Sequence, residues 1–231
     1  MRSKLNYIFD KIYVVSYDES SRLETLKDRL DGIEYEVFYG CNKKDINIDK
    51  LSEEGYTGHG DAKLFTAASF ACTFSHLYLY KKLKEEKVKN VLILEDDIIV
   101  VDSALENFYH CYSELPDTWD MLYIGFSNHN RNWDRVLENK KNYKNNLFIK
   151  GDNYMMGDHR LLPLEGTNAY AINNNFLDIA IEKQSNPKTM NPIADGLLFY
   201  LYCKLEYYVI IPQILPQIDN INFSYKKNSE K

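Results

Sequence analysis

Three consecutive acidic residues, Glu95, Asp96 and Asp97, carry the strongest chemical signal in the chain. The apolar run 91–94 precedes them and the apolar run 98–101 follows. Short runs of β-branched residues and leucine are typical of strands buried on both faces, and open α/β sheets bind ligands outside the carboxyl ends of such strands. Clustered carboxylates repel one another unless a cation holds them. The cluster therefore predicts a Mg²⁺ or Mn²⁺ site, shared with a substrate phosphate. The alternative is a solvated turn that only ends the strand, and the apolar residues on both sides disfavour it.

The elements before this cluster predict a nucleotide-binding α/β unit. Apolar periodicity indicates a strand over 11–17, a helix over 22–30 and a second strand over 35–40. No GxGxxG or GxxxxGK[ST] sequence occurs in this unit, so neither a dinucleotide fingerprint nor a P-loop is indicated. A cation on such a sheet favours a nucleotide diphosphate as substrate, because the cation neutralises the leaving diphosphate. With a sugar nucleotide as donor, the reaction is glycosyl transfer.

The rest of the chain alternates helices and strands without a linker between two domains. The expected elements are a polar loop over 42–64, helices over 66–86, 103–115, 175–182 and 193–205, and strands over 120–126, 147–150, 166–172 and 207–211. The polar insertion 127–146 is a candidate lid or acceptor loop. We therefore expect one domain over 1–218 and a flexible tail over 219–231.

Composition excludes several classes of partner. The 231 residues carry a net charge of −6, which argues against nucleic acid and anionic membranes. No apolar run approaches the roughly 20 residues of a membrane span, and the start of the chain has no signal-peptide pattern. We expect a cytoplasmic protein.

Several stretches match one known family in order. They are Ile12–Asp18, Cys72–His76 (C-x-x-S-H), Leu92–Asp97 (LEDD), Asp120–Gly125, Gly166–Ile172 (G-T-x-A-Y-x-I) and Pro192–Asp195. On these motifs the sequence resembles glycosyltransferase family 25, the bacterial lipopolysaccharide galactosyltransferases and the related collagen galactosyltransferases. Two features depart from the family pattern. The Arg-rich stretch after the first strand is reduced to Arg22, and the insertion 127–146 has no recognised motif, which leaves the acceptor open.

The resemblance implies a GT-A fold, a single α/β domain with a mixed central sheet. It also implies a UDP-sugar donor, Mn²⁺ or Mg²⁺ as cofactor, and inversion at the anomeric carbon. Galactose or glucose is the expected sugar. The acceptor hydroxyl belongs to a glycan, a lipid-linked sugar or a protein, and the sequence does not choose among them.

Site roles follow from the resemblance. Asp97 is expected to bind the metal and Glu95 the metal or the donor ribose, while Asp96 belongs to the donor site or faces the acceptor. The other expected donor-binding residues are Val14, Ser16, Asp18, Arg22, Ser75 and His76. For Arg22 the alternative is an ordinary surface arginine, and for His76 it is a buried structural histidine.

The acceptor side is expected at the later motifs. Asp195 is the candidate general base, because an inverting transfer needs a carboxylate that takes the proton of the acceptor hydroxyl. A carboxylate stabilised by a helix N-terminus fits the same position. Thr167, Asn168 and Tyr170 are expected to bind the acceptor. Gln217 is a candidate for a late metal or phosphate ligand, although nothing local marks it.

Two other functions remain possible from the sequence. The first is a catalytically silent sugar-nucleotide-binding scaffold, which the intact acidic triplet disfavours. The second is a Mg²⁺-dependent phosphotransfer or receiver-type α/β protein. In receiver-type proteins the acidic pair closes the first strand, whereas here the acidic cluster follows it by about eighty residues.

Overall fold

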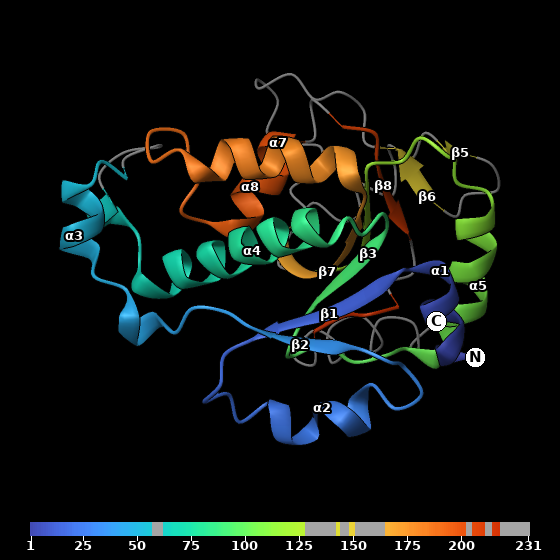
Figure 1. Cartoon of the computed structure of the whole chain (residues 1–231). Helices are drawn as coiled ribbons and strands as arrows, with labels where there is room; N and C mark the ends of the chain where they lie inside the picture. The colour runs from blue at the N-terminus through green and yellow to red at the C-terminus, as the bar shows by residue number, and fades with distance from the viewer. Residues whose placement is uncertain are drawn as a thin grey trace, which may run out of the picture.

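The protein is built around one mixed β-sheet. The computed structural model describes residues 1–56, 62–127, 142–143, 148–150, 165–201, 205–210 and 214–217. Within these ranges the sheet has eight strands in the order β2-β1-β3-β7-β4-β8-β6-β5 (Figure 1). The strands are β1 (Lys11–Ser16), β2 (Glu36–Tyr39), β3 (Val91–Glu95), β4 (Met121–Ser127), β5 (Asn142–Tyr143), β6 (Phe148–Lys150), β7 (Glu165–Ile172) and β8 (Tyr207–Ile210).

Strand directions change at β7. β1 pairs in parallel with both β2 and β3, as expected for a strand-helix-strand opening. β7 is antiparallel to its neighbours β3 and β4, while β8 is parallel to β4. The carboxyl end of β3 therefore lies between the carboxyl end of β1 and the start of β7.

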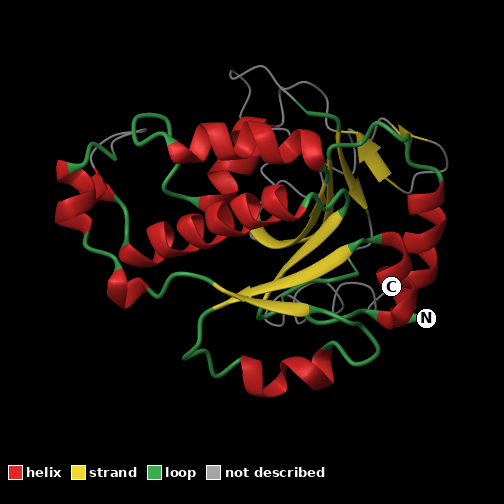
Figure 2. Cartoon of the chain, viewed as in Figure 1, coloured by secondary structure: helices red, strands yellow, loops and turns green. Residues whose placement is uncertain are grey.

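Helices cover both faces of the sheet (Figure 2). The α-helices are α1 (Leu5–Ile8), α2 (Leu23–Arg29), α3 (Ile48–Glu53), α4 (Ala67–Glu86), α5 (Asp102–Ser113), α7 (Asn174–Ser185) and α8 (Ala194–Leu201), and the 3₁₀ helices are η1 (Arg2–Lys4), η2 (Lys43–Asp45) and η3 (Ala62–Leu64). One core layer joins α1, α2 and α5 to the sheet, and the layer on the opposite face joins α4, α7 and α8 to it.

The side chains of β1 and β3 alternate between these two layers. Leu92 and Leu94 pack with α2 and α5, whereas Val91 and Ile93 pack with α4 and α7. This alternation is the period of two that any strand imposes. Because Glu95 continues it, the Glu95 side chain extends toward α4.

The long helix α4 has clear boundary signals. The Thr66 side chain accepts a hydrogen bond from the Ser69 backbone N–H, which satisfies one free donor of the first turn. The helix ends at Lys87, whose φ of 57° is left-handed and lets the backbone close the last turn. Between these ends α4 presents Cys72 and His76 to the sheet.

Most elements expected from the sequence are confirmed, including the α/β class and the mixed sheet. The expectation of an unstructured loop over 42–64 is wrong. There the Asn42 and Asn47 side chains cap η2 and α3, and Leu51 packs against residues of α4. Most of the insertion 127–146 and all of the expected tail 219–231 lie outside the described residues.

Among the helices that the structure describes, none is both long enough and apolar enough to cross a bilayer.

Candidate functional site

The acidic triplet lies where β1, β3 and β7 meet. Val15 of β1 pairs with Glu95 of β3, so the residues after the two strands leave the sheet together. On the other side, Leu94 pairs with Ala169 of the antiparallel β7, which brings residues 166–168 beside the triplet. Three segments distant in sequence thus meet at one edge of the sheet.

Asp96 is buried and fully engaged with the chain after β1. Its Oδ2 accepts hydrogen bonds from Ser16 Oγ and Ser20 Oγ, both at 2.6 Å, and its Oδ1 lies 3.0 Å from Arg22 Nη1. The residue is 5% exposed. A buried carboxylate is stable only when its oxygens are bonded in this way. Asp96 therefore fixes the position of the triplet relative to β1 and α2.

Arg29 of α2 holds the backbone of the same turn. Its Nη2 donates to the Asp96 carbonyl and its Nη1 donates to the Ile98 carbonyl, both at 2.7 Å. The two acceptor carbonyls belong to the residues on either side of Asp97. The turn that presents Asp97 is thus held from the backbone as well as from Asp96.

Asp97 is partly buried, and one of its two carboxylate oxygens has no hydrogen-bond partner. Arg22 Nη1 lies 3.1 Å from Oδ2, and Gln217 Nε2 donates to the same oxygen at 3.4 Å. Oδ1 is buried and has no hydrogen-bond partner. Burial, and secondarily the Glu95 carboxylate, raise the pKa of Asp97 to about 6, although Arg22 opposes the shift. This oxygen is suited to a cation.

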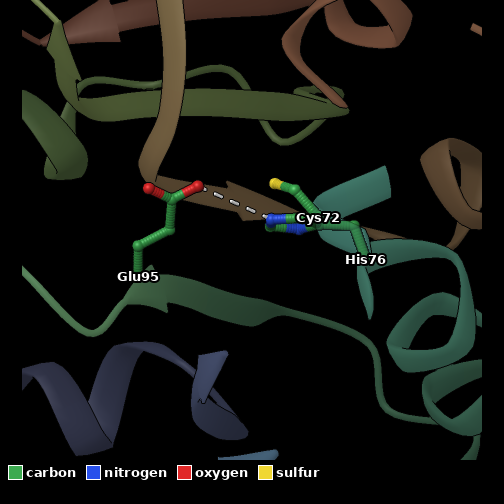
Figure 3. A group of neighbouring side chains, drawn as sticks. All are labelled: Cys72, His76 and Glu95. Atoms are coloured by element: carbon green, nitrogen blue, oxygen red, sulfur yellow. Dashed lines mark ion pairs between the residues drawn. The ribbon is translucent and has the colours of Figure 1, made fainter. Parts of the chain in front are cut away.

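Glu95 faces α4 and the start of β7. Thr167 Oγ1 donates a hydrogen bond to Glu95 Oε1, and His76 Nε2 lies 3.8 Å from the same oxygen (Figure 3). The Glu95 carboxylate also raises the pKa of Asp97, two residues further along the chain. Mg²⁺ and Mn²⁺ prefer carboxylate oxygens as ligands. The donor set formed by Glu95 and Asp97 fits such an ion.

A buried hydrogen bond to Tyr170, which in turn bonds Tyr80, holds His76 through its Nδ1 atom. His76 Nδ1 bonds to the Tyr170 hydroxyl at 2.7 Å, and this hydroxyl bonds to the Tyr80 hydroxyl at 2.6 Å. All three side chains are buried. Burial raises the pKa of both tyrosines, which keeps them as neutral hydrogen-bonding groups. These hydrogen bonds fix the orientation of the His76 imidazole toward Glu95.

Cys72 lies one helical turn before His76. One ligand atom each of Cys72, His76 and Glu95 fall within 4.8 Å of one another. Burial, together with the Glu95 carboxylate, raises the pKa of the Cys72 thiol, which is therefore protonated at neutral pH. The negative charges of Asp195 and Asp97 contribute to the same shift to a smaller extent.

Asp195 lies in the first turn of α8 and reaches β7. Its Oδ2 accepts a hydrogen bond from the Gly166 backbone N–H at 2.8 Å. The residue is only partly buried. Asp195 is therefore held beside the glycine that precedes Thr167, on the α8 side of the acidic triplet.

Exposure divides the predicted site residues into two groups. Asp18 and Arg22 are exposed, and Glu95, Asp97 and Asp195 are partly exposed. The others are buried, and they are Val14, Ser16, Ser75, His76, Asp96, Thr167, Asn168 and Tyr170. The side chains of the first group reach solvent, whereas those of the second are enclosed by the protein.

Three of the buried predictions need a different physical role. Val14 is part of the apolar core beneath α2, where its side chain has no exposed surface. Ser75 Oγ donates to the Ala71 carbonyl and accepts from the Cys41 backbone N–H, so it joins α4 to the segment after β2. Tyr170 uses its hydroxyl for His76 and Tyr80. The side chains of all three are thus engaged by other groups of the protein.

Several residues of the site carried little or no local signal. Ser20 carries no local sign of a role in the site, yet it bonds Asp96 seventy-six residues away. Arg29 and Tyr80 look like ordinary helix residues in the sequence. Gln217 was suggested without local support, and its amide does lie beside Asp97. Only pairings across the sheet reveal these contacts.

Comparison with known proteins identifies the family. The sequence model of glycosyltransferase family 25 (LPS biosynthesis protein) matches residues 9–186. A glycosyltransferase 25 family member of Drosophila melanogaster is 26% identical over 153 residues, which cover 61% of this chain and 24% of that protein. A procollagen lysyl hydroxylase and glycosyltransferase of Acanthamoeba polyphaga mimivirus is 24% identical over 135 residues, 51% of this chain and 15% of that protein. The chain thus spans about a quarter or less of the length of these relatives.

Solved structures with a similar chain path include two glycosyltransferases. One is involved in glycosylation of the major capsid of PBCV-1; it has a TM-score of 0.47 at 9% identity, covering 90% of this chain and 94% of that chain. The other is the galactosyltransferase LgtC in complex with donor and acceptor sugar analogs. It has a TM-score of 0.42 at 11% identity, covering 95% of this chain and 94% of that chain.

Proposed function

Because the chain belongs to glycosyltransferase family 25, we propose that it transfers a hexose from a UDP-sugar to a hydroxyl acceptor, with a divalent cation at Glu95 and Asp97. The observation that carries this proposal is the buried, unpartnered Oδ1 of Asp97, whose carboxylate is repelled by the negative charge of Glu95. Arg22 pairs with Oδ2 and offsets this repulsion only in part. When bound, Mn²⁺ or Mg²⁺ would neutralise the diphosphate that leaves the sugar.

The accessible residues around the cation site have distinct roles in this proposal. Arg22 is half-exposed and already bridges Asp96 and Asp97, so its remaining guanidinium donors are available to a phosphate. Gln217 orients the Asp97 carboxylate through Oδ2. Asp96, Ser16 and Ser20 hold the turn in place and do not contact the donor.

Asp195 is the proposed general base. The Gly166 N–H donates to Oδ2 of Asp195, so the Oδ1 atom does not take part in that hydrogen bond. The residue is partly exposed, beside the start of β7. A base on the face opposite the leaving diphosphate would remove the proton of the attacking hydroxyl, and the sugar would be transferred with inversion. The candidate sugars are galactose and glucose, and the candidate acceptor is a glycan hydroxyl, in keeping with the family description.

Thermal shift with nucleotide sugars tests the donor site. UDP-, GDP- and CMP-sugars are compared with and without Mn²⁺, since a ligand that binds the folded state raises Tm by mass action. We expect a UDP-sugar shift that requires Mn²⁺ and disappears in Asp97→Ala. Asp49→Ala is the matched control, because Asp49 is an exposed acid on α3 whose ion pair is with Lys63 and not with a residue of the site. An unchanged shift in Asp97→Ala would remove the site assignment.

Turnover tests the base. Asp195→Asn keeps the size of the side chain and its capacity to accept from Gly166, but loses the basic carboxylate. We expect it to retain Mn²⁺-dependent UDP-sugar binding and to lose about 10²-fold or more in transfer rate. The anomeric configuration of the product, followed by NMR, tests inversion. Donor binding with no transfer to any hydroxyl acceptor by the wild-type chain would instead favour the scaffold function.

A further inference from the structure

The group of Cys72, His76 and Glu95 combines three different ligand types at one point. Cys72 and His76 are four residues apart on α4 and so share one face of the helix, one turn apart. Glu95 approaches from the end of β3 (Figure 3). One ligand atom of each lies within 4.8 Å of the others. Sulfur, imidazole nitrogen and carboxylate oxygen therefore converge from two separate elements.

One ring nitrogen of His76 has no hydrogen-bond partner at this point. Its Nδ1 is used by Tyr170, but its Nε2 is buried and has no hydrogen-bond partner. Glu95 Oε1 is 3.8 Å from this nitrogen, which is too long for a hydrogen bond. A buried polar atom without a partner is uncommon and needs an explanation. Two ligands of one tetrahedral ion, each about 2.0–2.2 Å from it, lie roughly 3.3–3.6 Å apart, so the separation of 3.8 Å needs to close by only a few tenths of an ångström.

We propose that Cys72, His76 and Glu95 form a second cation site, selective for Zn²⁺ over Mn²⁺ and Mg²⁺, whose occupation inhibits the donor site. Zn²⁺ accepts sulfur, nitrogen and oxygen ligands with a water in the fourth position, whereas Mg²⁺ and Mn²⁺ prefer oxygen. Glu95 is the link between the sites. A Glu95 carboxylate bound to Zn²⁺ would no longer be available to the cation proposed at Glu95 and Asp97. The inhibition rests on the proposed function, whereas the Zn²⁺ binding itself does not.

The surroundings of the group agree with this selectivity. Cys72 offers a sulfur ligand, which a borderline ion such as Zn²⁺ accepts readily and a hard ion such as Mg²⁺ does not. The Tyr170 hydroxyl bonds His76 Nδ1 in the manner of the outer partners that orient histidine ligands in metal sites.

Co²⁺ titration of the full chain tests the binding, because Co²⁺ replaces Zn²⁺ and gives a thiolate-to-cobalt charge-transfer band. We expect one equivalent of Co²⁺ to produce the band, and excess Zn²⁺ to abolish it. Cys72→Ser should lose the band, while Cys41→Ser and Asp97→Asn should keep it. Circular dichroism melting verifies that each variant is folded. A folded wild-type chain without the band, or a Cys72→Ser variant that keeps it, would overturn the site.

Zinc inhibition tests the coupling. In the wild type, Zn²⁺ should abolish the Mn²⁺-dependent UDP-sugar thermal shift. Cys72→Ser should keep that shift and require at least about tenfold more Zn²⁺ to lose it, a change no smaller than the loss of an outer partner produces. Equal Zn²⁺ sensitivity in both proteins overturns the coupling. Failure of the proposed function gives a different pattern, namely a Co²⁺ band in a wild-type chain that shows no Mn²⁺-dependent UDP-sugar shift.

Discussion

The carboxylates of Glu95 and Asp96 are neighbours in the chain but bond to different layers of the fold. Glu95 contacts Thr167 and lies near His76, on the α4 side, whereas Asp96 bonds Ser16 and Ser20, on the α2 side. The alternation of β3 produces this division, because successive side chains of a strand leave opposite faces. One acidic triplet thus supplies a structural anchor and a candidate ligand from adjacent positions.

The division predicts opposite effects on stability for two adjacent aspartates. Asp96→Ala removes the acceptor of Ser16, Ser20 and Arg22, which leaves buried hydroxyls unpaired and should lower the free energy of unfolding by about 2–3 kcal/mol. Asp97→Ala should leave it unchanged or raise it, because burial already disfavours that charge. Urea unfolding at pH 7.5 without divalent ions measures both. Equal destabilisation by the two substitutions would contradict the assigned roles.

Asp97 also predicts a pH dependence of stability. Its pKa in the folded chain is about 6, above the unfolded value of about 3.9, so the folded state binds more protons between these values. Stability should therefore fall as pH rises from about 4 to above 6, by about 3 kcal/mol in total. Asp97→Asn should lose this contribution, and the exposed Asp49→Asn should retain it. The measurement is the free energy of urea unfolding against pH without divalent ions; identical profiles for Asp97→Asn and the wild type would refute the assignment.

Tyr170→Phe should destabilise the buried hydrogen-bond chain. The substitution removes the hydroxyl that joins His76 Nδ1 to the Tyr80 hydroxyl, and both partners stay buried. We expect a loss of about 1–3 kcal/mol. Tyr80→Phe is the control, since it leaves the bond between Tyr170 and His76 in place and should cost less. Chemical denaturation ranks the two variants, and the reverse order would show that Tyr170 does not join the pair.

Gly125→Ala should disturb the site from a distance. A Cβ at Gly125 would lie 1.9 Å from the Leu215 carbonyl oxygen, a backbone atom that cannot rotate away. The segment 214–217 lies between β4 and the residues after β3, with Ile214 donating to the Ile124 carbonyl at 3.2 Å. Displacing this segment moves Gln217 away from Asp97.

We therefore expect Gly125→Ala to lower both Tm and the Mn²⁺-dependent affinity for the UDP-sugar. Gln217→Ala removes only the amide that contacts Asp97, and should weaken binding with little change in Tm. Thermal shift and calorimetric titration on both variants separate the two effects. Wild-type Tm in Gly125→Ala would show that the close approach to Leu215 is absent.

The sequence by itself determined the α/β class, most helix and strand positions and the importance of the acidic triplet. These features are encoded locally, in the apolar periodicity, in the capping residues and in the clustering of like charges. The tertiary structure decided which side chains of the site contact one another. That Ser20 bonds Asp96, that Tyr170 supports His76 and that Gln217 lies beside Asp97 depends on strand order and register. No local pattern encodes which strand lies beside which, because that choice is made by packing of the whole sheet.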